Sequence, residues 1–179
     1  MSAAATVHAS AALVGECGVL IRGASASGKS SLLLALIAGG GLRNALVADD
    51  RVALAAHHGR LVATVPPELA GLIEVRGQGI LRRPHVSPVV VDLVVDLAPT
   101  AECPRMPEPD ERTEIVGIAV PRLVLPVGQG DGPLRIFAAL EEGLRQNPLS
   151  NQAVAASCVA ESIRQDARFG KHPRPKRDR

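Results

Sequence analysis

Eight consecutive residues near the N-terminus have the spacing of a loop that binds the phosphates of a nucleotide. Every fixed position of the pattern G-x-x-x-x-G-K-[ST] is met by Gly23-Ala24-Ser25-Ala26-Ser27-Gly28-Lys29-Ser30, which Ser31 follows. The glycines let consecutive backbone N–H groups point inward at an anion. Lys29 would reach the β and γ phosphates, and the Ser30 hydroxyl would bind Mg²⁺. The stretch from Gly23 to Ser31 is therefore the predicted nucleotide-binding site.

Lys29 is an unusual choice in a chain that otherwise uses arginine for positive charge. Of the 20 lysines and arginines only three are lysines, and the other two, Lys171 and Lys176, lie near the C-terminus. A phosphate loop requires a compact ammonium, whereas a Gly/Ser-rich turn before a core helix has no such requirement. The lysine therefore favours phosphate binding over a plain turn.

Carboxylates that could hold the metal of a bound nucleotide occur on two segments. Asp49 and Asp50 directly follow a short apolar run, whereas Asp92 and Asp96 lie within a longer one, on one face of it. Sites in α/β proteins collect at the carboxyl ends of strands, which favours Asp49 and Asp50. Neighbouring acids on extended backbone point in different directions, so one could face the metal and the other a reacting hydroxyl. A solvated strand end remains the alternative for either residue alone.

Three further polar residues could join such a site. His8, on the first predicted strand, would by itself be an ordinary strand histidine. Glu74 and Arg76 share one face of a later strand, where a surface ion pair is the simplest interpretation. Beside a bound nucleotide, the same two side chains could instead serve the metal and the phosphates.

The predicted elements place these residues where strands end and helices begin. An apolar strand at 18–22 leads into the loop, and strong helix formers at 31–38 follow it and stop at three glycines. The other predicted elements are a hairpin of 5–14 and 17–22, a strand at 45–48, a hairpin of 51–56 and 60–65, a strand at 71–80, a strand buried on both faces at 89–97, strands at 114–119 and 122–127, and helices at 134–146 and 149–167. Residues 99–112, rich in proline and acids, are a predicted surface loop. This mixture of strands and helices predicts an α/β fold.

Composition points to one domain in a reducing compartment. With 179 residues, 46% of them hydrophobic, the chain is long enough for one core, predicted for residues 1–167. Residues 168–179, with six basic residues and one acid, form a predicted disordered tail, and contact with an acidic partner or nucleic acid is the alternative. Three scattered cysteines favour neither disulfides nor zinc, and no export signal or membrane span is expected, so the predicted location is the cytoplasm. With two Phe and no Trp or Tyr, nucleic-acid binding by base stacking is not expected.

Four ordered stretches resemble the catalytic domain of the HPr kinase/phosphorylase family, bacterial enzymes that phosphorylate a serine of the phosphocarrier protein HPr. They are Val7-His8 with Gly18-Val19-Leu20-Ile21-Arg22-Gly23, the phosphate loop, Leu46-Val47-Ala48-Asp49-Asp50-Arg51-Val52, and Ile73-Glu74-Val75-Arg76-Gly77-Gln78-Gly79-Ile80. The last is similar to the family signature E-x-R-G-x-G-I, and Leu125-Pro126-Val127 is similar to the start of a later family loop. The resemblance implies a P-loop kinase-type α/β domain, with a mixed central sheet flanked by helices, like that of PEP carboxykinase.

The resemblance also implies an ATP-dependent protein-serine kinase that uses Mg²⁺ and acts on an HPr-type carrier of the phosphotransferase system. By the resemblance, Asp49 is the general base, assisted by His8, and Lys29 is catalytic. The implied metal ligands are Ser30, Asp50 and Glu74. A reverse reaction, in which phosphate attacks phosphoserine and pyrophosphate leaves, and a homohexamer are implied as well. The rival interpretation is a nucleotide-binding switch or adaptor without kinase activity.

The chain departs from the family pattern in several places. Full-length members carry an N-terminal domain, so we expect a form with the kinase domain alone. Ser31 stands where the family usually has glutamate, and extra glycines lengthen the turn after the first helix. Where the family places arginines, this chain has Gly128-Gln129-Gly130-Asp131-Gly132. Because guanidinium groups would relieve the repulsion between free phosphate and phosphoserine, we expect a competent kinase but a weak phosphorylase.

Overall fold

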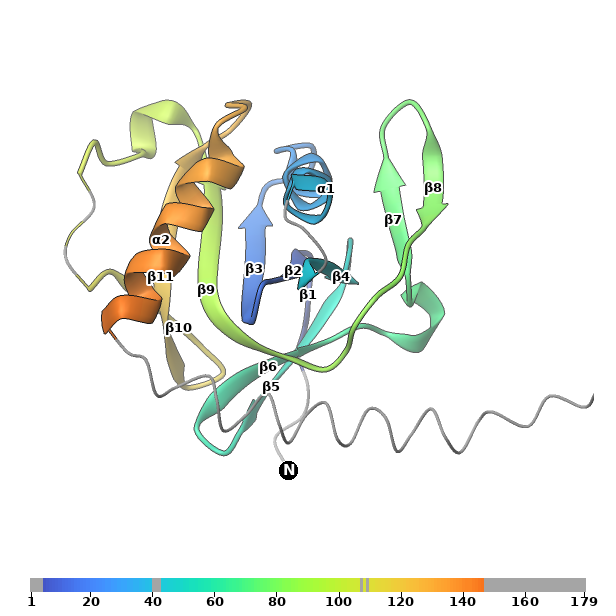
Figure 1. The fold of residues 1–179 in the computed structure, drawn as a ribbon, viewed down its shortest axis with the longest axis horizontal. Coiled ribbons are helices and arrows are strands. Elements are labelled where there is room, and N and C mark those ends of the chain that lie inside the picture. Colours follow the sequence, from blue (N-terminus) through green and yellow to red (C-terminus); the bar gives the residue numbers. More distant parts are fainter. Residues whose placement is uncertain (1–4, 40–42, 107, 109, 147–179) are drawn as a thin grey trace, which may run out of the picture.

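The computed structural model describes residues 5–39, 43–106, 108 and 110–146. Within this part, nine strands form one curled mixed sheet, and two further strands form a separate hairpin (Figure 1). The sheet contains β1 (Ala5–Val7), β2 (Ser10–Val14), β3 (Cys17–Gly23), β4 (Ala45–Ala48), β5 (Val52–His57), β6 (Arg60–Thr64), β9 (Val89–Ala98), β10 (Arg112–Ile115) and β11 (Ile118–Pro126). The separate hairpin contains β7 (Leu72–Val75) and β8 (Gly79–Arg82), and the two described α-helices are α1 (Lys29–Gly39) and α2 (Gly132–Gln146). The predicted α/β fold with a mixed sheet and flanking helices is confirmed.

Strand β9 is the centre of the sheet because it pairs with three other strands. Its first residues pair antiparallel with β6, the stretch from Val91 to Leu97 pairs parallel with β3, and the stretch from Val94 to Ala98 pairs parallel with β11. A parallel strand with neighbours on both sides is covered on both faces, which accounts for its nearly continuous run of valine and leucine. The prediction of a buried central strand at 89–97 is confirmed.

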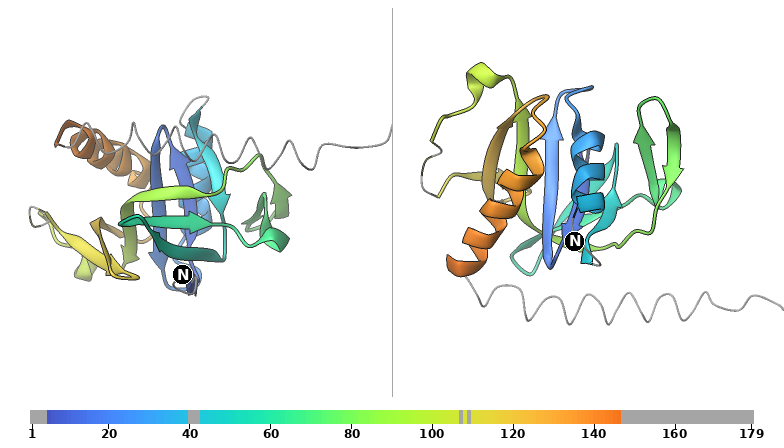
Figure 2. Two further views of the ribbon diagram at one scale, coloured as in Figure 1. Left: turned by 90° about the horizontal axis from the view of Figure 1, so that it is seen from below. Right: turned by 45° about the horizontal axis from the view of Figure 1, so that its top comes forward.

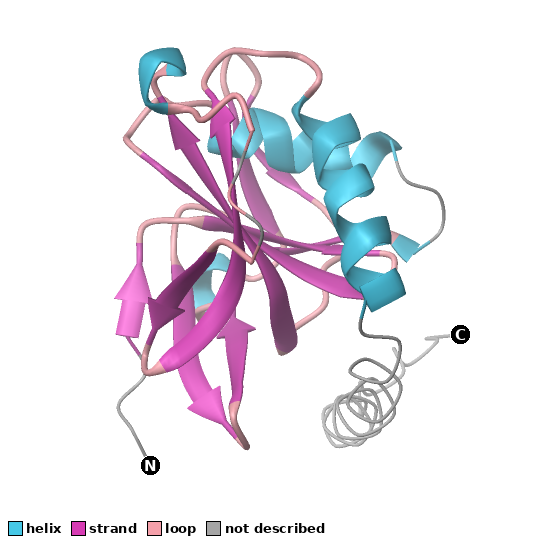
Figure 3. Ribbon diagram, turned by 90° about the vertical axis from the view of Figure 1, so that its left-hand side faces the viewer, coloured by secondary structure: helices cyan, strands magenta, loops and turns pink. Residues whose placement is uncertain are grey.

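Both α-helices cover the same face of the sheet. Figure 2 (left) and Figure 3 show α1 and α2 together on one side of the strands. Leu33 and Leu36 of α1 and Ile136 of α2 are buried in one apolar cluster with side chains of β3, β9 and β11. The first turn of α1 contains no acidic residue, so the positive end of its helix dipole stays open to an anion.

The sheet curls, so its strands β5 and β6 pack against the other face of β3 and β9. Leu20 of β3 and Val94 of β9 form a second buried cluster with Leu54 of β5 and Leu61 of β6. Consecutive residues of β3 therefore enter two separate cores, because side chains alternate along a strand. The end of β3, where the phosphate loop begins, is held from both sides.

Three predicted elements differ in detail from the structure. Residues 5–14 do not form one hairpin arm, because β1 pairs with β5 and only β2 pairs with β3. The predicted strand at 71–80, with glycines where the backbone must bend, is a hairpin. Gly77 in its turn has a φ of 82°, and Gly79, the first residue of β8, has a φ of 87°. The predicted strands at 114–119 and 122–127 are one hairpin that turns at Val116-Gly117, where both φ values are positive, so β11 begins at Ile118.

Some predictions lie outside the described residues, namely the helix at 149–167 and the basic tail at 168–179. Neither described helix has the length and apolar character needed to cross a membrane.

Candidate active site

The phosphate loop joins the end of β3 to the start of α1, as its spacing predicts. The Leu32 N–H donates to the Gly28 carbonyl at 2.9 Å, so helical hydrogen bonding begins within the loop. A Cβ on Gly23 would lie 2.6 Å from Ser27 Oγ and 3.0 Å from Leu97 Cβ. Only glycine fits where the loop passes this close to β9, which explains the first fixed glycine of the motif.

The Ser27 hydroxyl oxygen is buried in the loop and has no hydrogen-bond partner among the described residues. A buried hydroxyl without a partner is costly and calls for a further partner at the site. A phosphate oxygen in the loop would supply the missing acceptor. The residues present therefore fit a nucleotide's phosphates.

Lys29 lies over the loop and is only 6% exposed. Its Nζ donates to the Gly23 carbonyl at 3.0 Å and to the Ala24 carbonyl at 2.8 Å. Burial lowers the pKa of Lys29, and the nearby carboxylates of Asp49 and Asp50 raise it but do not fully offset the burial. The ammonium thus has neutral carbonyl acceptors, which phosphate oxygens could replace with stronger, charge-assisted bonds.

Asp49 follows β4 and is a buried carboxylate with three hydrogen-bond donors. It is 4% exposed. Its Oδ1 accepts from Ser10 Oγ at 2.6 Å and from Ser30 Oγ at 3.1 Å, and its Oδ2 accepts from the Glu74 N–H at 3.1 Å. Asp49 therefore connects β2, the first turn of α1 and β7.

Asp50 points away from this buried cluster and lies beside His8. Its φ of 66° is left-handed, a conformation that aspartate tolerates better than most residues. His8 Nδ1 lies 3.0 Å from the Asp50 carbonyl oxygen and 3.1 Å from Asp50 Oδ1. Because a carbonyl only accepts, Nδ1 is the donor here. The side chains of His8 and Asp50 are 52% and 60% exposed, so a substrate hydroxyl could reach them.

Glu74 reaches the cluster through its backbone, and its side chain is exposed. No ion pair joins Glu74 to Arg76 within the described part of the chain. In the same described residues, no group of three or more His, Cys, Asp or Glu side chains is arranged to hold a metal ion. Phosphate-loop sites need fewer protein ligands than that, because Mg²⁺ keeps several waters and binds the substrate phosphates. Of the predicted ligands Ser30, Asp50 and Glu74, the structure joins Ser30 to the carboxylate of Asp49 rather than to that of Asp50, and the oxygens of Ser30 and Asp49 fit such a site.

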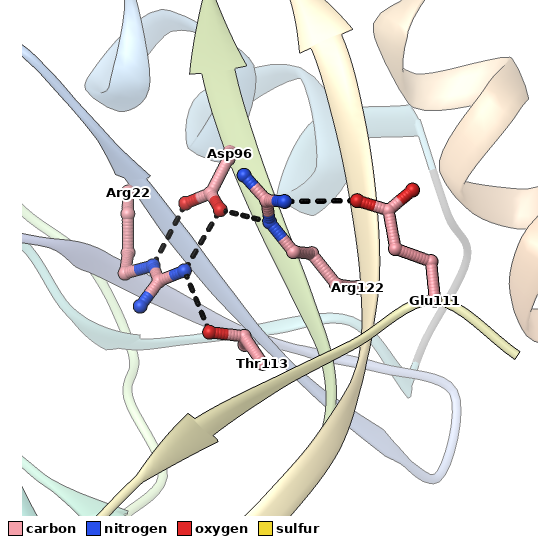
Figure 4. A network of polar contacts seen from close by, with 5 residues as sticks. All are labelled: Arg22, Asp96, Glu111, Thr113 and Arg122. Atoms are coloured by element: carbon pink, nitrogen blue, oxygen red, sulfur yellow. Dashed lines mark hydrogen bonds and ion pairs between the residues drawn. The ribbon is translucent and has the colours of Figure 1, made fainter. Parts of the chain in front are cut away.

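Asp92 and Asp96, the alternative acids, are engaged elsewhere. Arg22 and Arg122 both donate to Asp96, and Arg122 also pairs with Glu111 (Figure 4). Burial raises the pKa of Asp96, but the hydrogen bonds from Arg22 and Arg122 outweigh it and leave that pKa lowered. Asp92 pairs with Arg60 at 2.8 Å, and burial leaves its pKa raised. Neither carboxylate contacts the phosphate loop.

Residues 1–157 match the family model described as HPr Serine kinase C-terminal domain. The chain belongs to this family. The resemblance drawn from its four motifs is thereby confirmed.

Named members of the HPr kinase family match over most of the chain. The HPr kinase/phosphorylase of Clostridium acetobutylicum is 31% identical over 162 residues, which cover 85% of this chain and 52% of the relative. That of Chromobacterium violaceum is 38% identical over 146 residues, which cover 74% and 43%. The solved Hpr(Ser) kinase/phosphatase from Coxiella burnetii matches with a TM-score of 0.69 and 30% identity, over 79% of this chain and 97% of that chain. The chain thus spans about half the length of the curated relatives it matches.

Sequence reasoning missed Ser10. The structure brings Lys29, Ser30 and Asp49 together, sets His8 beside Asp50, and adds Ser10 as a donor to Asp49. The available signal was weak, namely one polar residue in an apolar strand. Its partner is 39 residues away in the sequence, so spacing could not reveal it.

A cavity of about 550 Å³ lies away from the phosphate loop, among the first residues of β6, the middle of β9 and the second half of α2. Its lining includes Leu61, Leu93 and Leu140 and the alternative acid Asp92, but none of the residues of the predicted phosphate loop.

Proposed function

We propose that this chain is an ATP-dependent kinase that phosphorylates a serine of an HPr-type phosphocarrier protein. The observation that carries the proposal is the meeting of Lys29 and Ser30, from the phosphate loop, with the buried Asp49 at the end of β4. A loop for phosphates, a hydroxyl for a metal and a carboxylate beside it are the parts that phosphoryl transfer requires. Family membership supports the choice of acceptor.

Phosphate binding belongs to the loop and to Lys29 in this proposal. Lys29 Nζ would exchange the carbonyls of Gly23 and Ala24 for β and γ phosphate oxygens, and the Ser27 hydroxyl would gain its missing acceptor. The start of α1, free of acidic residues, adds its positive end. Together these groups would offset the charge of the transferred phosphoryl group.

Magnesium would be held by Ser30, beside the carboxylate of Asp49, and Glu74 remains a proposed further ligand. A bound Mg²⁺ would neutralise developing charge on the phosphate oxygens. The Ser30 hydroxyl donates its proton to Asp49 Oδ1, which leaves the lone pairs of its oxygen free for the ion. Asp49 is therefore better suited to the metal side of the site than the sequence-based expectation implies.

For the general base we propose Asp50, which exchanges the roles that the resemblance implies for Asp49 and Asp50. The carboxylate of Asp49 is buried and already accepts three hydrogen bonds, whereas that of Asp50 is exposed beside His8. Asp50 would take the proton of the substrate serine as its oxygen attacks the γ phosphorus and ADP leaves. His8 would hold the Asp50 carboxylate in position through Nδ1.

The reverse reaction should be weak. Phosphorolysis requires phosphate to approach a phosphoserine, and the segment from Gly128 to Gly132 contains no arginine to relieve that repulsion. Arg135, the nearest candidate, donates to Asp131 at 2.8 Å and to Gln129 at 3.3 Å. These bonds within the loop and the first turn of α2 compete with any bond from Arg135 to a free phosphate.

Two coarser features accompany the proposal. We propose a homo-oligomer, with the family's hexamer as the expected form, and we propose the cytoplasm as its location, where an HPr-type carrier would be met. Sedimentation of the purified chain tests the first, and fractionation of cells tests the second. A monomer at micromolar concentration would remove the oligomer from the proposal.

The kinase assignment is tested by incubating the full chain with labelled ATP, Mg²⁺ and a purified HPr-type carrier. The expected result is label on a serine of the carrier, absent when that serine is replaced by alanine. ATP binding without transfer to any HPr-type carrier tried would favour the rival switch or adaptor. Absence of nucleotide binding would overturn the assignment of the phosphate loop itself.

A further inference from the structure

Ser10 makes the shortest contact of the Asp49 carboxylate. Its side chain is fully buried, and its Oγ donates to Asp49 Oδ1 at 2.6 Å. An O–H···O⁻ distance of this length is typical of a charge-assisted hydrogen bond. Ser10 is the first residue of β2, so this donor belongs to a strand of the main sheet.

The three donors to Asp49 differ in what holds each of them in place. Ser30 belongs to the nucleotide site, and Glu74 belongs to the β7–β8 hairpin outside the main sheet. Ser10 lies on a strand that pairs with both β3 and β4, the strands that lead into the phosphate loop and Asp49. Of the three donors, Ser10 is therefore the one whose position depends neither on a bound nucleotide nor on the β7–β8 hairpin.

We infer that Ser10 is a positioning residue that orients the Asp49 carboxylate so that the Ser30 hydroxyl faces a nucleotide-bound metal ion. A hydroxyl has one proton, and Ser30 gives that proton to the same oxygen, Oδ1, that Ser10 holds. With Oδ1 fixed, the lone pairs of Ser30 are left for Mg²⁺. This inference rests on the proposed function above, because it concerns the same site.

A purely structural role for Ser10 predicts something different. A buried carboxylate needs donors, so Ser10 could serve only to stabilise the fold. In that case its loss would lower the melting temperature without changing how Mg²⁺ affects nucleotide binding. A positioning role predicts a change in the Mg²⁺ effect itself, separate from any change in stability.

The experiment compares Ser10→Ala with the wild-type full chain by titrating a fluorescent ADP analogue with and without Mg²⁺. Binding without Mg²⁺ should stay within twofold, whereas the gain in affinity on adding Mg²⁺ should fall roughly tenfold, the scale of one lost hydrogen bond to a charged group. Ser10→Thr keeps the hydroxyl and should retain the gain. Thr64→Val removes the hydrogen bond from the hydroxyl of Thr64 on β6 to the backbone carbonyl of Ala53 on β5, so it is the matched control and should behave as wild type.

Each outcome decides between the claims. If the wild type binds no nucleotide, the proposed function fails. If the wild type binds with a normal Mg²⁺ effect and Ser10→Ala shows the same effect, the positioning role is overturned, whatever the melting temperatures. Should Ser10→Ala not fold, Ser10→Cys keeps the volume with a weak donor, and an unchanged Mg²⁺ effect in that variant overturns the inference equally.

Discussion

At the scale of single residues, the site combines a buried cation with carboxylates in two different environments. Lys29 and Asp49 are buried, while Asp50 and His8 face solvent. Burial lowers the pKa of Lys29, so the fold holds this charge at a cost that only a strong anionic partner would offset. A buried cation of this kind marks a candidate ligand-binding site.

Replacing Lys29 by alanine should reduce phosphoryl transfer about 100-fold or more, because no other described lysine can supply the charge at the β and γ phosphates. The variant should remain folded, since a cation that burial disfavours is removed. Initial rates with labelled ATP measure the effect. Arg43→Ala, which removes an exposed cation paired with Glu16, is the control and should keep the wild-type rate.

Separate replacement of Asp49 and Asp50 by asparagine tests the exchanged roles. Asp50→Asn should bind ATP with Mg²⁺ normally yet lose transfer, because an amide cannot accept the serine proton. Asp49→Asn should weaken Mg²⁺-dependent nucleotide binding as well. Titrations and rates on both variants give the answer. Normal binding with no transfer in Asp49→Asn, together with an active Asp50→Asn, would restore the original assignment of Asp49 as base.

At the scale of elements, ion pairs join the end of strand β3 to the neighbouring strands. Arg22 immediately precedes the phosphate loop and lies opposite Asp96 in the β3–β9 register. Arg122 on β11 binds the same carboxylate, so three parallel strands are joined just below the loop (Figure 4). These ion pairs fix the position of β3, the strand that leads into the phosphate loop. They leave the backbone N–H groups of the loop available to a ligand.

The Asp96→Asn variant should lose about 2 kcal/mol of unfolding free energy, because two partly buried guanidinium groups would lose their counter-charge. The folded protein lowers the pKa of Asp96, so its contribution is present above the unfolded carboxyl pKa of about 3.9 and is lost as pH falls through the folded value. Urea unfolding should therefore show a constant difference in unfolding free energy between Asp96→Asn and wild type from pH 7 downward, and this difference should shrink toward pH 3.

Asp92→Asn is the matched control for that series. Burial raises the pKa of Asp92, so its charged form destabilises the folded protein. As pH falls through that raised pKa, the unfolding free energy of the wild type should therefore rise relative to that of Asp92→Asn. If the unfolding free energies of Asp96→Asn and Asp92→Asn changed with pH in the same way, the opposite pKa shifts of Asp96 and Asp92 would be contradicted.

The loop before α2 gives a second prediction at this scale. Gly130 has open space around its missing Cβ, so Gly130→Arg can be accommodated where Gly128, at a φ of 78°, is a poorer choice. The added guanidinium should raise phosphate-dependent pyrophosphate release several-fold relative to the forward rate. Gly130→Gln, of similar length without charge, should not. Comparable forward and reverse rates in the wild type would show that the missing arginines do not matter.

At the scale of the whole molecule, two apolar cores hold the sheet from both faces, and the site lies where the parallel strands end. The family match ends at residue 157, before the basic residues 168–179. The candidate site and the two described apolar cores therefore lie within the stretch that matches the family.

Deleting residues 168–179 should leave the melting temperature and the kinase rate within about twofold of the intact chain. The reason is that the deleted stretch, rich in proline and basic residues, has too little apolar surface to join a core. A calorimetric scan and an initial-rate assay measure both effects. A loss of rate greater than tenfold would assign the tail a part in binding the carrier.

The sequence alone determined the features that depend on neighbours in the chain. The strand, loop and helix around Lys29 follow from glycine spacing, helix propensity and apolar runs, all of which act within a few residues. The family also followed from ordered motifs of this local kind. The buried strand at 89–97 could be predicted because its own composition requires two covered faces.

Only the tertiary structure decided which distant groups meet. Ser10 joins Asp49 across 39 residues, the Glu74 N–H joins it across 25, and Arg22 reaches Asp96 across 74. The pairing of β1 with β5 belongs to the same class. Hydrogen bonds of this kind depend on how the sheet curls and on strand register, which no local pattern encodes. For that reason the two adjacent acids could be found from the sequence, but the different surroundings of Asp49 and Asp50 could not.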